Sequence, residues 1–90
     1  MAKIRFTGHL RRFFPTLQEG DVPAATVAEL VRALEARYPG MASYLVDDQG
    51  GLRKHVNIFV NDVLIQDRKK LSDGLEETAE VFVVQALSGG

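Results

Sequence analysis

The chain has 90 residues, of which 46% are hydrophobic and 26% are charged, with a formal net charge of −1 at pH 7. This length is typical of one domain with a single modest core. The balanced charge argues against nucleic acid as a directly bound partner, and the absence of cysteine excludes disulfides, thiolate zinc sites and a cysteine nucleophile. No apolar run reaches membrane-spanning length and no signal-peptide core begins the chain, so we expect a cytoplasmic protein that contacts no membrane.

Two short strands are expected near the N-terminus. Polar and apolar residues alternate over residues 3–7, which places Ile4 and Phe6 on one face of a first strand. Turn-forming residues at 18–21 allow a second strand between residues 17 and 22. The two strands form an N-terminal hairpin in this prediction.

The clearest helix begins after Thr26. Thr26 and Glu29 have the spacing of a capping box, in which the threonine hydroxyl accepts from a free amide and the glutamate accepts from the amide of the cap residue. Pro39 and Gly40 end the helix. Apolar residues recur along it at helical spacing, so we expect this stripe to be core rather than a binding site. The stripe consists of Val27, Leu30, Val31, Leu34 and Tyr38.

The second half of the chain favours strands. Residues 56–60 have the strongest strand pattern, and Asn61-Asp62 has the composition of a tight turn into a further strand at 63–65. Residues 71–75 are expected to form a short helical turn or a loop. The last strand is expected at 80–87.

This order of elements predicts an α+β domain. A hairpin, a helix and a return strand follow one another in the ubiquitin-like β-grasp, and we expect a mixed sheet of four to five strands packed on one main helix. The domain is placed at residues 1–86, and residues 87–90 are expected to form an extended, flexible C-terminal tail.

The chain ends in Gly89-Gly90. Because glycine has no Cβ, such an end can lie extended in a channel too narrow for other side chains, and nothing shields the last carbonyl carbon. A chance pair of glycines at a frayed terminus is the simpler interpretation of these two residues alone. The strand pattern that runs directly into them favours a functional tail.

Three blocks of the sequence resemble the MoaD/ThiS family of sulfur carrier proteins. They are residues 26–30 at the capped helix, residues 55–62 around the strongest strand and residues 81–90 at the end of the chain. The second block most resembles carriers that serve cysteine synthesis. Two departures from the family pattern, at residues 76–80 and 85–86, bear on partner recognition and leave the diglycine intact.

This resemblance implies a chemical role for the tail. In the family, an ATP-dependent adenylating enzyme converts the C-terminal carboxylate, here that of Gly90, to an acyl-adenylate, and a sulfur donor then leaves a thiocarboxylate. A synthase accepts the sulfur. Leu87, Ser88 and Gly89 would enter the active site of the partner, while the domain itself is no enzyme, has no catalytic residue and binds no cofactor or metal.

A docking face is expected on the side of the sheet turned away from the helix. If Val81 and Val83 point to the core, strand alternation turns Phe82 and Val84 outward, and the same alternation turns Phe59 outward from its own strand. These three residues would form an exposed apolar patch of the kind that binds partners. An inverted alternation or a bulge would remove the patch.

Two other functions stay open on the sequence. A protein modifier would use the same adenylate and join Gly90 to target lysines through an isopeptide bond. A β-grasp interaction module would carry the diglycine without activation. For a carrier, four sulfur-receiving pathways remain open, those of molybdopterin, thiamine, cysteine and thiolated RNA.

Other polar clusters are interpreted as ordinary surface. His9 and His55 lack metal-ligand spacing, and the loop at 47–51 lacks the alternating oxygen ligands and the distal glutamate of a calcium site. Three short basic runs are expected to be solvated. They are residues 11–12, 53–54 and 68–70.

Overall fold

The structure is a computed structural model, and the residues that it describes are 2–7, 10, 12, 14–15 and 17–85. All statements about conformation below refer to these residues. The sequence features that lie outside them are His9, Arg11 of the first basic run, Ala86 and Leu87 at the end of the expected last strand, and the rest of the expected tail, Ser88, Gly89 and Gly90.

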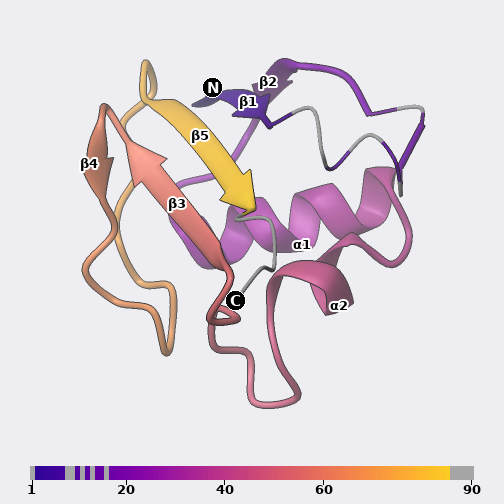
Figure 1. Ribbon diagram of the computed structural model, residues 1–90. Coiled ribbons are helices and arrows are strands. Elements are labelled where there is room, and N and C mark those ends of the chain that lie inside the picture. Colours follow the sequence, from indigo (N-terminus) through magenta and orange to yellow (C-terminus); the bar gives the residue numbers. More distant parts are fainter. Residues whose placement is uncertain (1, 8–9, 11, 13, 16, 86–90) are drawn as a thin grey trace.

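Five strands form one mixed sheet in the order β2-β1-β5-β3-β4 (Figure 1). β5 lies at the centre, parallel to β1 and antiparallel to β3, and the two outer pairs are antiparallel. The strands are β1 (Ala2–Phe6), β2 (Gly20–Val22), β3 (Val56–Val60), β4 (Val63–Leu64) and β5 (Glu80–Gln85). The predicted mixed sheet with an N-terminal hairpin is therefore confirmed.

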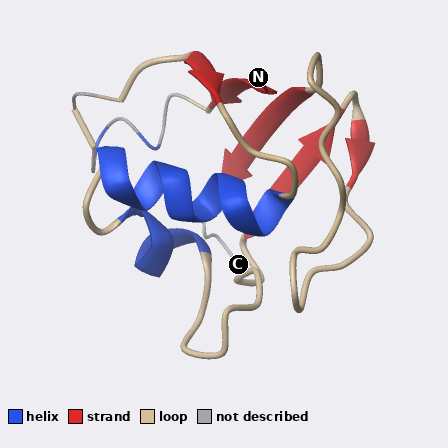
Figure 2. Cartoon of the chain, turned by 180° about the vertical axis from the view of Figure 1, so that it is seen from behind, coloured by secondary structure: helices blue, strands red, loops and turns tan. Residues whose placement is uncertain are grey.

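One main helix, α1 (Val27–Arg37), covers one face of the sheet (Figure 2). The buried side chains of α1 belong to the predicted apolar stripe, and Tyr38, at the C-cap, is half-buried. They pack with the inward residues of the strands in a single core. The most deeply buried side chains of this core include Ile4, Leu30, Leu34, Ile58, Val81 and Val83. In the described part of the chain, no helix is long and apolar enough to cross a membrane.

The start of α1 follows the predicted capping pattern with one difference. The Thr26 hydroxyl accepts from the Glu29 amide at 3.2 Å, as predicted. The Glu29 carboxylate reaches past the cap residue and accepts from the Ala25 amide at 3.1 Å. The prediction that Glu29 binds the Thr26 amide is wrong, because the carboxylate is engaged one residue earlier, by the Ala25 amide.

The segment at 71–75 is a loop, and it completes the start of α1. The Val27 amide donates to the Asp73 carbonyl at 3.0 Å, and the Ala28 amide donates to the Leu71 carbonyl at 2.9 Å. Amides in the first turn of a helix have no partner within the helix and need such acceptors. Leu71 has a left-handed φ of 56°, a conformation that a leucine keeps only where its surroundings impose it.

A second helix, α2 (Met41–Leu45), has no counterpart among the elements expected from the sequence. It follows Gly40, whose φ of 100° is a left-handed conformation that glycine adopts without strain. The first turn of α2 is capped from α1, because the Glu35 carboxylate accepts from the amides of Gly40 and Ala42. These hydrogen bonds, with that of Gly40 first, lower the pKa of Glu35. Two buried side chains, one at each end of α2, extend the core.

Candidate docking face of the sheet

The outer face of the sheet, opposite α1, carries the predicted apolar residues. On β5, Val81 and Val83 are buried, whereas Phe82 is 37% exposed. Phe59 on β3 and Val84 on β5 are half-buried on the same outer face. β3 pairs with β5 residue by residue, so neither an inverted alternation nor a bulge displaces these side chains.

One row of side chains crosses four strands in the middle of this face. Phe82 pairs directly with Phe59 on β3, and Phe59 pairs with Leu64 on β4. On its other side Phe82 pairs with Arg5 on β1. The Arg5 guanidinium lies 5.5 Å from the centre of the Phe82 ring, which is a cation–π contact. Because directly paired residues share a face, the row is continuous from β1 to β4.

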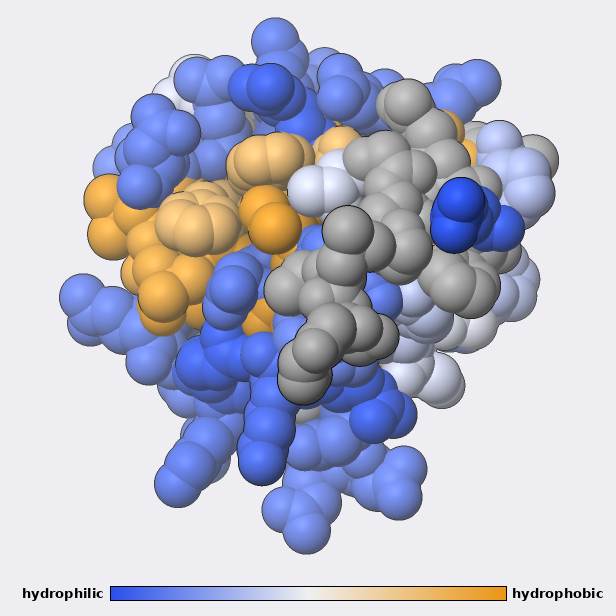
Figure 3. Space-filling model, in the orientation of Figure 1, coloured by the Kyte–Doolittle hydropathy of each residue, from blue (hydrophilic) through white to orange (hydrophobic). Residues whose placement is uncertain are grey.

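We term Phe59, Leu64, Phe82 and Val84 the sheet-face patch. Figure 3 shows hydrophobic surface gathered over β3, β4 and β5, with polar surface around it. Leu64 and Arg5 are absent from the sequence prediction. The two-residue turn after β3 was the available signal for Leu64, because it fixes the register that puts Leu64 beside Phe59. No local sequence pattern indicates Arg5, because its position beside Phe82 depends on the pairing of β1 with β5, which are far apart in the sequence.

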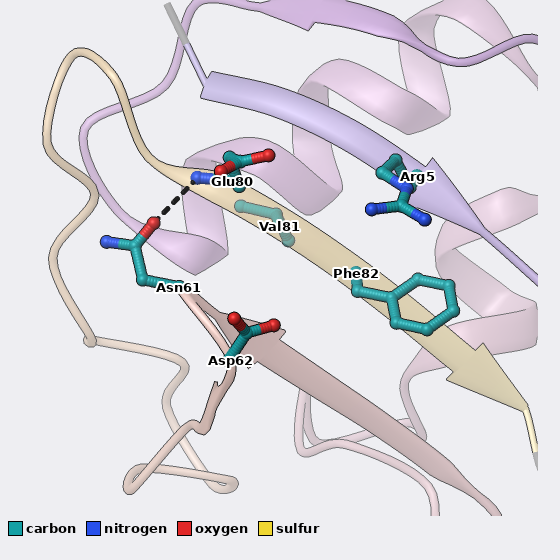
Figure 4. A pocket seen from close by; sticks show the side chains of 6 residues that line it. All are labelled: Arg5, Asn61, Asp62, Glu80, Val81 and Phe82. Atoms are coloured by element: carbon teal, nitrogen blue, oxygen red, sulfur yellow. Dashed lines mark hydrogen bonds between the residues drawn. The ribbon is translucent and has the colours of Figure 1, made fainter.

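The turn between β3 and β4 is linked to the start of β5. Asn61 and Asp62 have left-handed φ values of 52° and 68°, as the predicted tight turn requires. The Asn61 amide donates to the Glu80 carbonyl at 2.8 Å, and the Glu80 amide donates to the side-chain oxygen of Asn61 at 3.0 Å (Figure 4). This double link fixes β4 and its turn relative to β5, and so fixes one edge of the sheet-face patch.

A small hollow of about 120 Å³ lies between this turn and the patch. Figure 4 shows Arg5 and Phe82 projecting from neighbouring strands, with Asp62 across from them on the turn. The lining residues are Arg5, Asn61, Asp62, Glu80, Val81 and Phe82. Carboxylates and a guanidinium beside an aromatic ring provide a polar edge to an apolar surface, the composition expected at the margin of a protein interface.

The end of β5 is tied to the residue that follows β1. The Thr7 amide donates to the Val83 carbonyl at 3.2 Å, and the Gln85 amide donates to the Thr7 hydroxyl oxygen at 3.4 Å. Gln85 also pairs with Val56 at the start of β3. The last described residue of the chain is therefore held on both sides.

The histidines and carboxylates of the described residues do not form a metal site. In that part of the chain no group of three His, Cys, Asp or Glu residues is placed to hold a metal ion. His55 is half-buried. The two carboxylates whose pKa is lowered, Glu35 and Asp67, accept from backbone amides and, in Asp67, also from a hydroxyl, so both hold local structure. The chemistry that the outer face offers is recognition by apolar contact and charge.

Comparison with known proteins identifies the family. A sequence model of the ThiS family matches residues 4–90. The chain is 33% identical over 66 residues to small archaeal modifier protein 3 of Haloferax volcanii, with 73% of this chain and 71% of the relative covered. It is 31% identical over 67 residues to sulfur carrier protein CysO of Mycobacterium tuberculosis, with 72% of each chain covered.

The fold has a counterpart among solved structures. A chain in the crystal structure of the Amycolatopsis orientalis BexX/CysO complex aligns with a TM-score of 0.84 and 22% identity, and the alignment covers 100% of both chains. At this identity the likeness concerns the fold, and it confirms the predicted ubiquitin-like β-grasp. The chain belongs to the ThiS family of ubiquitin-like β-grasp proteins, and the relatives that it matches are small sulfur carriers and protein modifiers rather than enzymes.

Proposed function

We propose that this protein is a sulfur carrier whose Gly90 carboxylate is activated by an ATP-dependent adenylating enzyme and converted to a thiocarboxylate. The observation that carries the proposal is that the strand bearing part of the sheet-face patch leads, in the sequence, to the diglycine. β5, the central strand, bears Phe82 and Val84 of the patch, and only three residues separate Gln85 from Gly89-Gly90 in the sequence. The same element thus supplies a docking surface and leads to the diglycine.

The chemistry needs activation because a carboxylate is a poor electrophile. An oxygen of the Gly90 carboxylate attacks the α-phosphorus of ATP, pyrophosphate leaves, and the acyl-adenylate forms. Hydrosulfide, or a donor equivalent to it, then attacks the carbonyl carbon, and AMP leaves with the bonding electron pair. The sulfur remains as a thiocarboxylate that a synthase can accept. In this scheme the partners bind ATP and catalyse each step, and the carrier binds no cofactor.

The tail supplies reach and the patch supplies affinity. Extended, Leu87, Ser88, Gly89 and Gly90 span roughly 13 Å, enough to enter the active site of a neighbouring protein. The body stays outside and docks through Phe59, Leu64, Phe82 and Val84. Interface energy concentrates in a few well-packed apolar anchors, and the Arg5–Phe82 contact and the hollow beside it add charge contacts at the edge. We place this exchange in the cytoplasm, where the adenylating enzyme has access to ATP.

The test is the intact mass of the protein after incubation with ATP, the adenylating enzyme and sulfide. We expect a mass gain equal to the difference between a sulfur and an oxygen atom, together with release of AMP. A variant that lacks Gly90 should fold, because the described core ends at β5, and should show neither change. Release of AMP by this truncated variant, or no mass change in the full chain with an enzyme that adenylates it, contradicts the proposal.

A second candidate is a protein modifier joined through Gly90 to target lysines. The similarity to small archaeal modifier protein 3 favours it, and the chemistry differs only in the nucleophile that attacks the adenylate. Peptide mass spectrometry of cell extracts distinguishes the two functions. Lysines that carry the C-terminal residues of this chain would indicate a modifier, and thiocarboxylate without such conjugates would indicate a carrier alone.

A further inference from the structure

A groove separate from the sheet-face patch lies beside α1 and α2. It has a volume of about 420 Å³ and runs between α1, α2 and the two loops that follow α2 and β4. Five of its lining residues are apolar. They are Ala28 and Val31 of α1, Ala42 of α2, Val46 and Leu71.

Three cations stand along this groove, Arg32 on α1 and Lys69 and Lys70 in the loop after β4. All three residues are exposed. Within the described residues, no carboxylate forms an ion pair with any of their side chains. A cluster of cations beside apolar surface, none of them ion-paired to a carboxylate, favours the binding of an anionic group.

Two carboxylates, those of Asp47 and Asp67, lie close to the two lysines and offset part of this charge. Asp47 lines an adjoining hollow of about 440 Å³ that shares Lys69 and Lys70 with the groove. One carboxylate oxygen of Asp47 accepts from the amides of Gln49 and Gly51, at 2.9 and 3.0 Å. Asp47 is therefore engaged with its own loop, and the residues lining the groove itself carry three cations and no carboxylate.

The basic wall of the groove is held rigidly. The Asp67 carboxylate accepts from the amides of Lys69 and Lys70, at 3.2 and 2.9 Å, and from the Ser72 hydroxyl. The next residue, Leu71, is buried and its carbonyl accepts from the Ala28 amide of α1. Because the loop is fixed to α1, the backbone of the two lysines is already ordered before a partner binds. Binding therefore loses less conformational entropy.

We propose that this groove is a second docking site, and that its occupant is a short acidic segment of a partner protein that carries an apolar side chain. The apolar side chain would lie against Val31 and Val46, and flanking carboxylates would meet Arg32, Lys69 and Lys70. Charge complementarity is the argument for this occupant. The groove and the sheet-face patch share no residue, so one partner can hold the groove while another uses the patch. The proposal is independent of chemistry at Gly90.

A selection from a random peptide display library on the full chain tests this proposal. We expect enriched peptides with a net negative charge around an apolar residue. The strongest peptide, synthesised and titrated, should shift amide NMR signals of Ala28, Ala42 and Val46 and leave those of the sheet-face patch unchanged. Its affinity should fall about tenfold in a Lys69→Glu/Lys70→Glu variant and fall as salt is added, because exposed charge pairs are screened.

Controls separate the groove from general electrostatics and from misfolding. Lys54→Glu makes the same charge change at an exposed lysine outside the groove and should leave the affinity unchanged. Arg32→Gln removes a charge on α1 rather than in the lysine loop, and we expect it to weaken binding as well. This result supports the proposal even if the double lysine variant fails to fold. The proposal is overturned if no acidic peptide is enriched, if binding survives both sets of substitutions, or if the signals move on the sheet face. Binding of RNA to the groove in preference to every peptide also overturns it.

Discussion

The Tyr44 hydroxyl, on α2, donates a 2.8 Å hydrogen bond to the side-chain oxygen of Gln85, the last residue of β5. These residues are 41 positions apart in the sequence, and the bond ties a short helix to the strand that leads to the diglycine. The Tyr44 ring also meets Phe14 edge-to-face, with centroids 5.8 Å apart. α2 therefore positions the point from which the chain continues toward Gly90.

Removing this hydroxyl should affect activation more than stability. We expect Tyr44→Phe to lower the free energy of unfolding by about 1 kcal/mol, the usual net contribution of one hydrogen bond. The ring and its contact with Phe14 are kept. Because the end of β5 loses one of its fixed points, the rate of adenylation should fall several-fold at saturating enzyme. Urea unfolding and single-turnover AMP release measure the two effects.

Tyr38→Phe is the matched control for this prediction. The Tyr38 hydroxyl accepts from the Gln18 amide at 3.2 Å, and neither residue belongs to β5. Its removal should cost similar stability and leave the adenylation rate unchanged. Equal rates for Tyr44→Phe and the unchanged protein would mean that α2 has no part in presenting the chain end.

The sheet-face patch yields a prediction about docking. Phe82→Glu puts a charge in the centre of the apolar row, and we expect binding to the adenylating enzyme to weaken by more than tenfold, since central anchors carry most of the interface energy. The free energy of unfolding should fall by only about 1 kcal/mol, because Phe82 is 37% exposed and Arg5 can pair with the new carboxylate. Isothermal titration and thermal unfolding separate the effects.

Val63→Glu is the control that tests the assignment of faces. Val63 is 63% exposed, but it pairs with Val60 and so points to the opposite side of β4 from Leu64. The same charge placed there should leave docking unchanged. If Val63→Glu weakens binding as much as Phe82→Glu, the docking surface extends around the sheet edge and includes residues beyond the sheet-face patch.

Much of this fold was predictable because its signals are local. The α1 stripe, the Thr26 cap and the Asn61-Asp62 turn each depend on residues within one or two turns of chain. Alternation along β5 then gave the outward direction of Phe82. At these features the local conformational preference of the sequence agrees with the folded structure, so the local pattern alone is enough to predict them.

The features that escaped prediction depend on distant contacts. α2 has no capping residue of its own, since Glu35 supplies its cap from the preceding helix. The left-handed Leu71 is imposed by hydrogen bonds to Asp67 and α1, and no composition rule places leucine in that conformation. The same long-range pairing puts Arg5 beside Phe82 and the lysine loop beside α1.

The Asp67 carboxylate should make stability depend on acid. Its hydrogen bonds, with that of the Ser72 hydroxyl first, lower the pKa of Asp67 to about 2, below the value of 3.8 for a free aspartate. A carboxyl group whose pKa is lower in the folded state stabilises the fold above the unfolded pKa. Its contribution is thus present above pH 4 and is lost as the pH falls toward 2.

Asp67→Asn tests this assignment. The asparagine amide has one acceptor oxygen where the carboxylate has two, so it cannot accept from both the Ser72 hydroxyl and the amides of Lys69 and Lys70, and the variant should be less stable at pH 7. It should also lose less stability than the unchanged protein between pH 4 and pH 2. Denaturant unfolding at several pH values measures both effects, and an identical acid dependence in the two proteins would assign the acid sensitivity to other carboxylates.

The core of α1 should be separable from docking. Leu30 is 0% exposed beneath the sheet face that carries the inward strand residues, and we expect Leu30→Ala to lower the free energy of unfolding by about 2–5 kcal/mol, the range for buried leucine truncations. Leu30→Met, which nearly conserves volume, should cost less than about 1.5 kcal/mol. Because Leu30 lies in the core and belongs neither to the sheet-face patch nor to the diglycine end of the sequence, the rate of thiocarboxylate formation per folded molecule should not change in either variant. The folded fraction is measured by circular dichroism under the assay conditions.

A tenfold fall in the rate of the folded fraction would show that α1 takes part in activation, and the outer face of the sheet would then not be the sole docking surface for the adenylating enzyme.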